Sequence, residues 1–322
     1  MKKWVKRSLV GAGALLLLTG VGAAGYGWHV YRTVEKTAVQ IYEPIQPSTY
    51  VSKDPDIGQT APEAKTQELI SKKHPFTVLV MGVDQRENDR GRADSLIMLA
   101  VNPIKQSILM FNIPRDTRTE IIGHGTVDKI NHAYAFGGTE MSKRTVEHFL
   151  DYPVDYYIKI NMEGFSKLID LMGGVTVDNS FAFDIDGYHY DKGTLKLSGD
   201  EALMYARMRY EDPRGDLGRN SRQRDILQQV MKKALNFNNI AQIQKLLNQL
   251  GTSVKTDVTF DEMKTFIADY RTDLKSFDSV EISGKGSTIN GIWYSIVSKE
   301  EQDRIHNLLK EQMNVPEGAK GE

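Results

Sequence analysis

The sequence predicts a single layered α/β domain with a mixed central sheet, preceded by one N-terminal transmembrane helix. Between residues 74 and 313, short apolar runs typical of buried strands alternate with longer amphipathic runs typical of helices. Strands that alternate with helices form layered sheets. Two early strands joined by a turn at Asn102-Pro103 make this sheet mixed, and no internal repeat divides the region.

The first element is a membrane anchor. Residues 1–7 are basic, and the apolar run at residues 8–30 is long enough, as a helix, to cross about 30 Å of hydrocarbon. Aromatic residues flank this run: Trp4, Tyr26, Trp28 and Tyr31. Because basic residues stay on the cytoplasmic side, we expect a single-pass protein of the cell membrane with a cytoplasmic N-terminus and an extracytoplasmic domain. A cleaved signal peptide ending in the small residues 21–24 is the alternative.

Composition narrows the function classes of the external part. The chain of 322 residues has no cysteine, which excludes thiol nucleophiles, zinc–thiolate sites, iron–sulfur clusters and disulfides. Of its 41 basic residues, five lie at or before Arg32, which leaves 36 against 42 acidic residues and a net charge of −6. That balance argues against a nucleic-acid partner. Any anion must therefore be held by a local cluster of cations.

The remaining elements follow in order. Residues 31–73, polar with four prolines, read as a stalk, and residues 314–322 as a polar tail. Strands are expected at residues 75–83, 95–101, 107–113, 154–161 and 175–177. Helices are expected at residues 141–150, 164–172, 198–208, 219–237, 240–250, 260–270 and 299–313. Ser198 and Glu201 form a capping box at one helix start.

A charged loop connects the first two strands. Asp84 ends one strand and Asp94 opens the next, so both carboxylates can return to one edge of the sheet, where open α/β sheets bind ligands. Two carboxylates with water and phosphate oxygens suit Mg²⁺. A solvated acidic loop, with Asp94 capping a backbone turn, is the alternative.

Arginines follow two further elements. Arg115 comes directly after the third strand, where it can bind phosphate oxygens or form a structural ion pair. Residues 205–224 contain six arginines and three acids. Arg207 and Arg209 can converge only if their helix ends near residue 209, as Pro213 indicates.

The start of the next helix adds to this cationic cluster. Arg219, Arg222 and Gln223 share one face of its first turns. Cations oppose the dipole at a helix N-terminus, so a bound anion would explain them, and a solvated basic surface is the alternative. Lys129 offers another charge for phosphate, whereas His132 reads as a hydrogen-bonded structural histidine.

These elements resemble, in order, the motifs of the LytR–CpsA–Psr family, and most closely its wall teichoic acid branch. The matching motifs are Gly-Val-Asp (82–84), Gly-Arg-Ala-Asp-Ser (91–95), Ile-Pro-Arg-Asp (113–116), Lys-Ile-Asn-His-Ala-Tyr (129–134), Tyr-Ala-Arg-Met-Arg (205–209), Gly-Asp-Leu-Gly-Arg (215–219) and Arg-Gln (222–223). The strong similarity covers about residues 75–227. Asn112 departs from the pattern, since relatives usually carry Ser before Ile-Pro-Arg.

The resemblance implies a site and a reaction. It implies Mg²⁺, with Mn²⁺ as a substitute, held by Asp84 and Asp94. It places around a pyrophosphate the residues Arg92, Arg115, Lys129, Arg207, Arg209, Asp216, Arg219 and Gln223. Asp84, Asp94, Arg92 and Arg115 would be catalytic, one of the two carboxylates acting as base. A long apolar tunnel for the polyprenyl chain is also implied.

The implied partners are the membrane, peptidoglycan and a glycopolymer linked to polyprenyl pyrophosphate, with no nucleic acid. The expected reaction is phosphoryl transfer: a peptidoglycan hydroxyl attacks the polymer-linked phosphate and expels polyprenyl phosphate. Two alternatives stay open. One is a polyprenyl-pyrophosphate hydrolase, and the other is a lipid-pyrophosphate binding or regulatory protein, similar to an attenuator.

Overall fold

The computed structural model describes residues 40–46, 49–57, 74–84, 90–236, 246, 248–266 and 274–314. The expected anchor at residues 8–30 and the tail beyond residue 314 lie outside these ranges, as do residues 85–89 of the charged loop. The helix expected at residues 240–250 lies mostly outside them. Within the described ranges, no helix combines the length and the apolar character needed to span a membrane.

A six-stranded mixed sheet forms the centre of the domain, in the order β11-β6-β1-β2-β3-β12. The strands are β1 (Phe76–Asp84), β2 (Arg92–Asn102), β3 (Ser107–Asn112), β6 (Tyr156–Asn161), β11 (Val254–Thr256) and β12 (Ser276–Glu281). β1 pairs antiparallel with β2 and parallel with β6, and β3 pairs parallel with β12. The expected mixed sheet is therefore confirmed.

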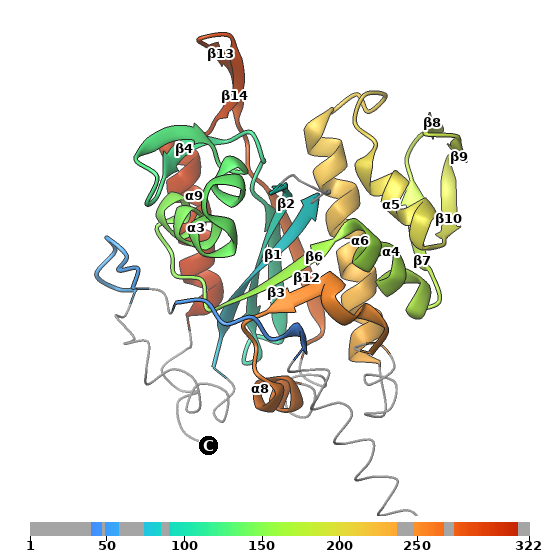
Figure 1. Ribbon diagram of the computed structural model, residues 1–322, viewed down its shortest axis with the longest axis horizontal. Helices are drawn as coiled ribbons and strands as arrows, with labels where there is room; N and C mark the ends of the chain where they lie inside the picture. The colour runs from blue at the N-terminus through green and yellow to red at the C-terminus, as the bar shows by residue number, and fades with distance from the viewer. Residues whose placement is uncertain are drawn as a thin grey trace, which may run out of the picture.

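Helices cover both faces of this sheet (Figure 1). On one face lie α3 (His132–Leu150) and α9 (Lys299–Met313), which pack on Leu79, Met98 and Phe111. On the other face lie α6 (Asp216–Leu235) and α8 (Phe260–Thr265), which pack on Val78 and Leu99. Because residues alternate between faces along a strand, these two apolar sets give a three-layer αβα domain.

A smaller lobe packs against α6 beside the sheet (Figure 1). It contains α4 (Met162–Leu171), α5 (Gly199–Arg207) and two hairpins, β7 (Val175–Asn179) with β10 (Gly193–Leu197) and β8 (Phe183–Ile185) with β9 (Tyr188–Tyr190). Ile226 and Val230 of α6 belong to its apolar core. The expected capping box of Ser198 and Glu201 is present at the start of α5.

Two hairpins stand near the end of the sheet where β1 stops (Figure 1). They are β4 (Arg118–Ile121) with β5 (Thr126–Lys129), and β13 (Lys285–Ile289) with β14 (Ile292–Ile296). Neither was expected, because their short strands lack a clear alternation of apolar and polar residues.

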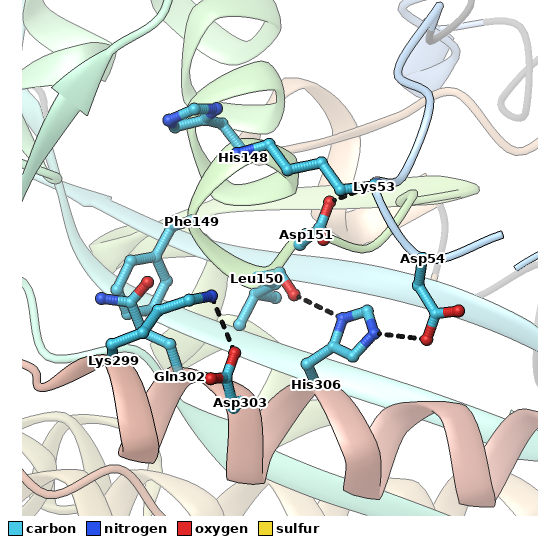
Figure 2. A pocket seen from close by; sticks show the side chains of 10 residues that line it. All are labelled: Lys53, Asp54, His148, Phe149, Leu150, Asp151, Lys299, Gln302, Asp303 and His306. Atoms are coloured by element: carbon cyan, nitrogen blue, oxygen red, sulfur yellow. Dashed lines mark hydrogen bonds and ion pairs between the residues drawn. The ribbon is translucent and has the colours of Figure 1, made fainter.

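Two parts of the expected stalk, residues 40–46 and 49–57, pack on the domain. Tyr42 forms a parallel bridge to Thr256 at the edge of the sheet. Further along, Asp54 accepts from Lys310 Nζ at 2.7 Å and contacts His306 Nε2 at 3.2 Å. Figure 2 shows this second contact beside a polar cavity of about 440 Å³ between α9 and the end of α3. We call residues 40–46 and 49–57 the strap.

Candidate functional site

Asp94 occupies a β-bulge in β2. Gly82 pairs with Ser95 and Val83 pairs with Ala93, so Asp94 is an extra residue between two regular pairs. A bulge locally twists a strand and redirects a side chain. The Asp94 carboxylate meets the turn after β3, where Arg115 Nη1 lies 3.0 Å from its Oδ1. This geometry brings together the first two motifs that the sequence analysis singled out.

Arg115 is the centre of a charged network. Its Nε lies 3.7 Å from Asp116 Oδ2, and Lys129 Nζ lies 2.7 Å from Asp116 Oδ1. Asn131, just before α3, donates to Asp94 Oδ1 at 3.0 Å. Burial disfavours the charge of Arg115, but Asp94, Asp116 and Asp216 outweigh that effect and raise its pKa. Arg115 is therefore a permanently charged donor held by neighbouring carboxylates.

The first turn of α6 forms the opposite wall of the site. Arg219 Nη2 lies 2.8 Å from Asp216 Oδ1, and Arg209 Nε lies 3.7 Å from the same oxygen. Gly215 precedes the helix with a φ of 57°, a conformation that glycine adopts without strain. It lets the chain turn sharply from α5 into α6, so that Arg209 and Arg219 meet at Asp216. Asp216, which was expected near the pyrophosphate, thus holds the two arginines together, and its expected contact with a pyrophosphate stays a prediction.

Arg219 is a buried cation with unsatisfied donors. Its side chain makes no hydrogen bond from Nε or Nη2 within the described ranges, although Nη2 forms the ion pair with Asp216. Burial lowers the pKa of Arg219, Asp216 opposes this effect, and the charge of Arg115 adds to the lowering. Asp216 raises the pKa of both arginines, which indicates that Arg115 and Arg219 lie near one another across the site. Buried donors without acceptors and adjacent like charges are stabilised by a bound anion.

Gln223 joins α6 to the sheet at the base of the site. Its Oε1 accepts from Ser95 Oγ at 2.9 Å and from Asn112 Nδ2 at 3.1 Å. Asn112 in turn accepts from Arg224 Nη1 at 3.0 Å. Asn112, which departs from the family pattern, therefore bridges Gln223 and Arg224. Gln223 therefore positions the start of α6 against the ends of β2 and β3.

Arg222 does not share the ligand-facing side that its spacing indicated. Its Nη1 contacts Asp212 Oδ2 at 2.5 Å, and its guanidinium donates to the carbonyls of Tyr205 and Met208. The end of a helix leaves carbonyl groups without partners, and Arg222 satisfies them at the end of α5. The expectation of a common face with Arg219 was wrong for this reason. Arg222 is structural.

Two other candidate pyrophosphate-binding residues, Arg92 and Arg207, lie at the edge of the site. Arg92 pairs directly opposite Asp84 on the neighbouring strand and is exposed. Arg207 ends α5, is also exposed, and contacts Met204 Sδ at 4.0 Å. Within the described part of the chain, neither side chain forms an ion pair with the network around Arg115. Their expected pyrophosphate contacts stay predictions.

The carboxylate oxygens of Asp84 and Asp94 are the type of ligand that a magnesium ion prefers. Asp84 and Asp94 lie at the same end of paired strands, and the contacts of Asp94 with Arg115 and Asn131 both fall on Oδ1. The described residues contain no group of three or more His, Cys, Asp or Glu arranged to hold a metal. Mg²⁺ commonly takes one or two carboxylates and completes its octahedron with water and substrate phosphates. A closed metal cage would not fit here, whereas a shared phosphate–metal site does.

Three residues that sequence reasoning did not assign help to build the site: Ser95, Asn112 and Asn131. Each lies inside or beside one of the family motifs. Their polar side chains at the end of a strand or the start of a helix are the sequence feature that could have identified them. His132 was expected to be structural, and its Nδ1 lies 2.8 Å from Asp128 Oδ2.

Comparison with known proteins agrees with the fold and the motifs. The model of the LytR_cpsA_psr family matches residues 29–311. The chain is 45% identical over 313 residues to the polyisoprenyl-teichoic acid–peptidoglycan teichoic acid transferase TagU of Halalkalibacterium halodurans, covering 97% of this chain and 100% of that protein.

Two solved structures are also similar. The crystal structure of Bacillus subtilis TagU is 44% identical, with a TM-score of 0.62, covering 76% of this chain and 99% of that one. The LytR-CPS2A-psr family protein YwtF (TagT), solved with bound octaprenyl pyrophosphate lipid, is 26% identical, with a TM-score of 0.60, covering 76% and 92% of the two chains.

Proposed function

The chain belongs to the LytR_cpsA_psr family, and we propose that it transfers teichoic acid from a polyisoprenyl pyrophosphate carrier to peptidoglycan. The relative TagU is named for this transfer, and the relative TagT binds a polyprenyl pyrophosphate. The observation that carries the proposal is the pair of walls around Arg115 and Arg219. Buried donors without acceptors, beside a second arginine, are suited to a pyrophosphate.

The chemistry is phosphoryl transfer. A hydroxyl oxygen of peptidoglycan attacks the phosphorus that carries the polymer, its bond to the polyprenyl phosphate oxygen breaks, and polyprenyl phosphate leaves. A carboxylate of Asp84 or Asp94 takes the hydroxyl proton. Such transfers depend mainly on positioning and on neutralising charge. Arg115 and Arg219 bind the bridging and terminal oxygens from opposite walls.

Mg²⁺ is part of the proposal. Bound by Asp84 and Asp94, it would neutralise negative charge on the phosphate oxygens. We also propose that residues 8–30 anchor the protein in the membrane and place the domain outside the cell, where a lipid-linked donor in the outer leaflet is accessible.

The test uses the full chain in mild detergent with Mg²⁺, a polyprenyl-pyrophosphate-linked teichoic acid and peptidoglycan oligomers. Mass spectrometry detects the polymer–peptidoglycan adduct, and chromatography measures released polyprenyl phosphate. An adduct that disappears with a chelator and returns with Mg²⁺ is expected. Lipid cleavage without an adduct would indicate a hydrolase, and bound but intact donor would indicate a binding protein.

Variants make the test specific to the site. Arg115→Ala should abolish transfer. Arg144→Ala is the matched control, because Arg144 is a surface arginine of α3 whose ion pair with Glu140 lies within one helix. Full transfer by Arg115→Ala would contradict the assignment of the site.

A further inference from the structure

The β13–β14 hairpin is built onto the loop that carries the candidate site. Ser295 N donates to the carbonyl of Asp116 at 2.9 Å, and Ser295 forms a parallel bridge with Thr117. Asp116 is the residue that holds Lys129 and contacts Arg115. The hairpin is thus connected by backbone hydrogen bonds to a wall of the site, and Figure 1 shows it projecting from the domain beside β4.

One face of the hairpin packs on the β4–β5 hairpin. Tyr294 is buried, and its hydroxyl donates to Asp128 Oδ1 at 3.3 Å. The Tyr294 ring lies 5.8 Å from the Arg118 guanidinium and 6.0 Å from Lys129 Nζ. These contacts fix the orientation of the hairpin relative to the site.

The other face presents an aromatic surface to solvent. Neighbouring residues of a strand point to opposite faces, so Trp293 lies on the face away from Tyr294. Trp293 is 44% exposed. A Cβ at Gly286 would lie 3.2 Å from the indole, so the ring packs closely over the backbone at Gly286. The indole is therefore supported on one side and open on the other.

The residues around this indole are small and polar. Thr288 pairs directly opposite Trp293 and shares its face, and Asn290 lies in the turn of the same hairpin. A flat apolar ring with neighbouring hydroxyl and amide groups matches a sugar ring, which has an apolar C–H face and a rim of hydroxyls. Aromatic side chains of this kind often anchor binding surfaces because they bury a large area and lose little rotamer entropy.

We propose that the Trp293 face of the hairpin binds a sugar ring of the acceptor glycan, next to the unit whose hydroxyl is modified. This inference rests on the proposed function and names the part of the molecule that recognises the acceptor. In the proposed function the pyrophosphate binds between Arg115 and the first turn of α6, and the hairpin is attached to the Arg115 wall through Asp116.

A lipid surface is the competing occupant, and the geometry favours a glycan. The aliphatic Ile292 is 45% exposed, but it directly precedes Trp293 in the strand and therefore lies on the opposite face of the hairpin. The two apolar side chains form no common patch for a membrane. A sugar needs the aromatic face specifically.

Binding can be measured without any reaction. The chain has three tryptophans, at positions 4, 28 and 293, so Trp4→Phe and Trp28→Phe in the full chain leave Trp293 as the only indole. Titration with lipid-free peptidoglycan glycan oligosaccharides should change its fluorescence and saturate. No change at millimolar glycan, or an equal change with vesicles of anionic phospholipid, would overturn the proposal.

Kinetics then separate the hairpin from the site. Trp293→Leu should raise the KM for the acceptor glycan by about tenfold, the scale of one lost aromatic contact, while the affinity for polyprenyl pyrophosphate stays unchanged. Trp293→Phe should keep the KM for the acceptor glycan close to that of the wild type. Ile292→Ala is the matched control and should leave this KM unchanged. An unchanged KM in Trp293→Leu, or an equal loss in Ile292→Ala, would refute the proposal.

The glycan titration and the transfer kinetics together distinguish this proposal from the proposed function. If the wild type binds glycan through Trp293 but forms no adduct, the transferase assignment fails and the glycan site stands. If adduct forms normally in Trp293→Leu, the glycan site fails and the transferase assignment stands.

Discussion

Methionine in place of Arg219 should make the protein more stable and abolish transfer. Arg219 is only 6% exposed, and its Nε and Nη2 make no hydrogen bond within the described ranges. Burial and the charge of Arg115 lower its pKa despite the ion pair with Asp216. The folded state therefore disfavours this charge in the absence of an anion.

The magnitude follows from the contacts. Replacing a whole buried ion pair by apolar residues is often neutral or stabilising by about 1–4 kcal/mol. Here only the cation is removed, but the Asp216 side chain is 17% exposed and keeps a contact with Arg209 at 3.7 Å, so its carboxylate stays paired and partly solvated, unlike the 3% exposed Asp212. We therefore expect the low end, an increase of about 1 kcal/mol in the free energy of unfolding, or roughly 2–4 °C in Tm for a domain of this size.

Arg222→Met is the matched control on the same helix. Arg222 is also 6% exposed, but its guanidinium binds Asp212 and two carbonyls at the end of α5. Its removal leaves a buried carboxylate unpaired, which should cost about 3–5 kcal/mol. The same substitution, three residues apart, should thus have opposite effects on stability.

The assay is urea unfolding of the full chain in detergent, without pyrophosphate, followed by circular dichroism. Transfer is measured on the same preparations. A loss of more than about 1 kcal/mol in Arg219→Met would show that Arg219 holds the fold together, contrary to its contacts. Unaltered transfer would show that it does not bind the donor.

Three further substitutions test other parts of the structure. Gly218→Ala should unfold the domain or cost more than about 3 kcal/mol in urea unfolding, since the new Cβ would lie 1.8 Å from Asp212 Oδ2; a cost below 1 kcal/mol would contradict that packing. Burial raises the pKa of Asp257 to about 6, so its stabilising contribution is present below about pH 4 and is lost as the pH rises through 6. Asp257→Asn does not titrate, so its unfolding free energy relative to the wild type should increase by at most about 3 kcal/mol between pH 4 and 7, and a flat difference would refute this reasoning. Asn112→Ser removes the bridge between Gln223 and Arg224 and should cost about 1–2 kcal/mol in thermal unfolding with little change in transfer at saturating donor; unchanged stability would show that the bridge is weak.

Much of the fold follows from local patterns. The strands β1, β2 and β3 were expected within a few residues, because continuous apolar runs are typical of strands buried on both faces, and β6 was expected from its alternating residues. The helices α4, α5, α6 and α9 were expected from their periodicity and caps. Short strands such as β8, β9, β13 and β14 were missed, since three to five residues carry little periodicity.

The site was predictable in residue type and less so in geometry. The sequence indicated that Asp94, Arg115 and Arg219 converge, but the bulge that redirects Asp94 leaves no trace in the alternation of residues. Arg219 and Arg222 looked equivalent on a helix. What separates them is the end of α5, whose free carbonyls draw Arg222 away, and this long-range contact is absent from any local window.

The strap shortens the length of chain between the proposed membrane anchor and the domain. Its first described residue, Gln40, is already attached to the sheet edge, because its carbonyl accepts from Lys255 Nζ at 2.8 Å and Tyr42 bridges to Thr256. In the proposed topology, nine residues separate an anchor at residues 8–30 from Gln40, and nine residues span at most about 30 Å. The proposed anchor would therefore keep the domain within a thin layer over the membrane, where its search for a membrane-bound donor is almost two-dimensional. A short tether of this kind raises the effective concentration of the donor at the site without any additional contact.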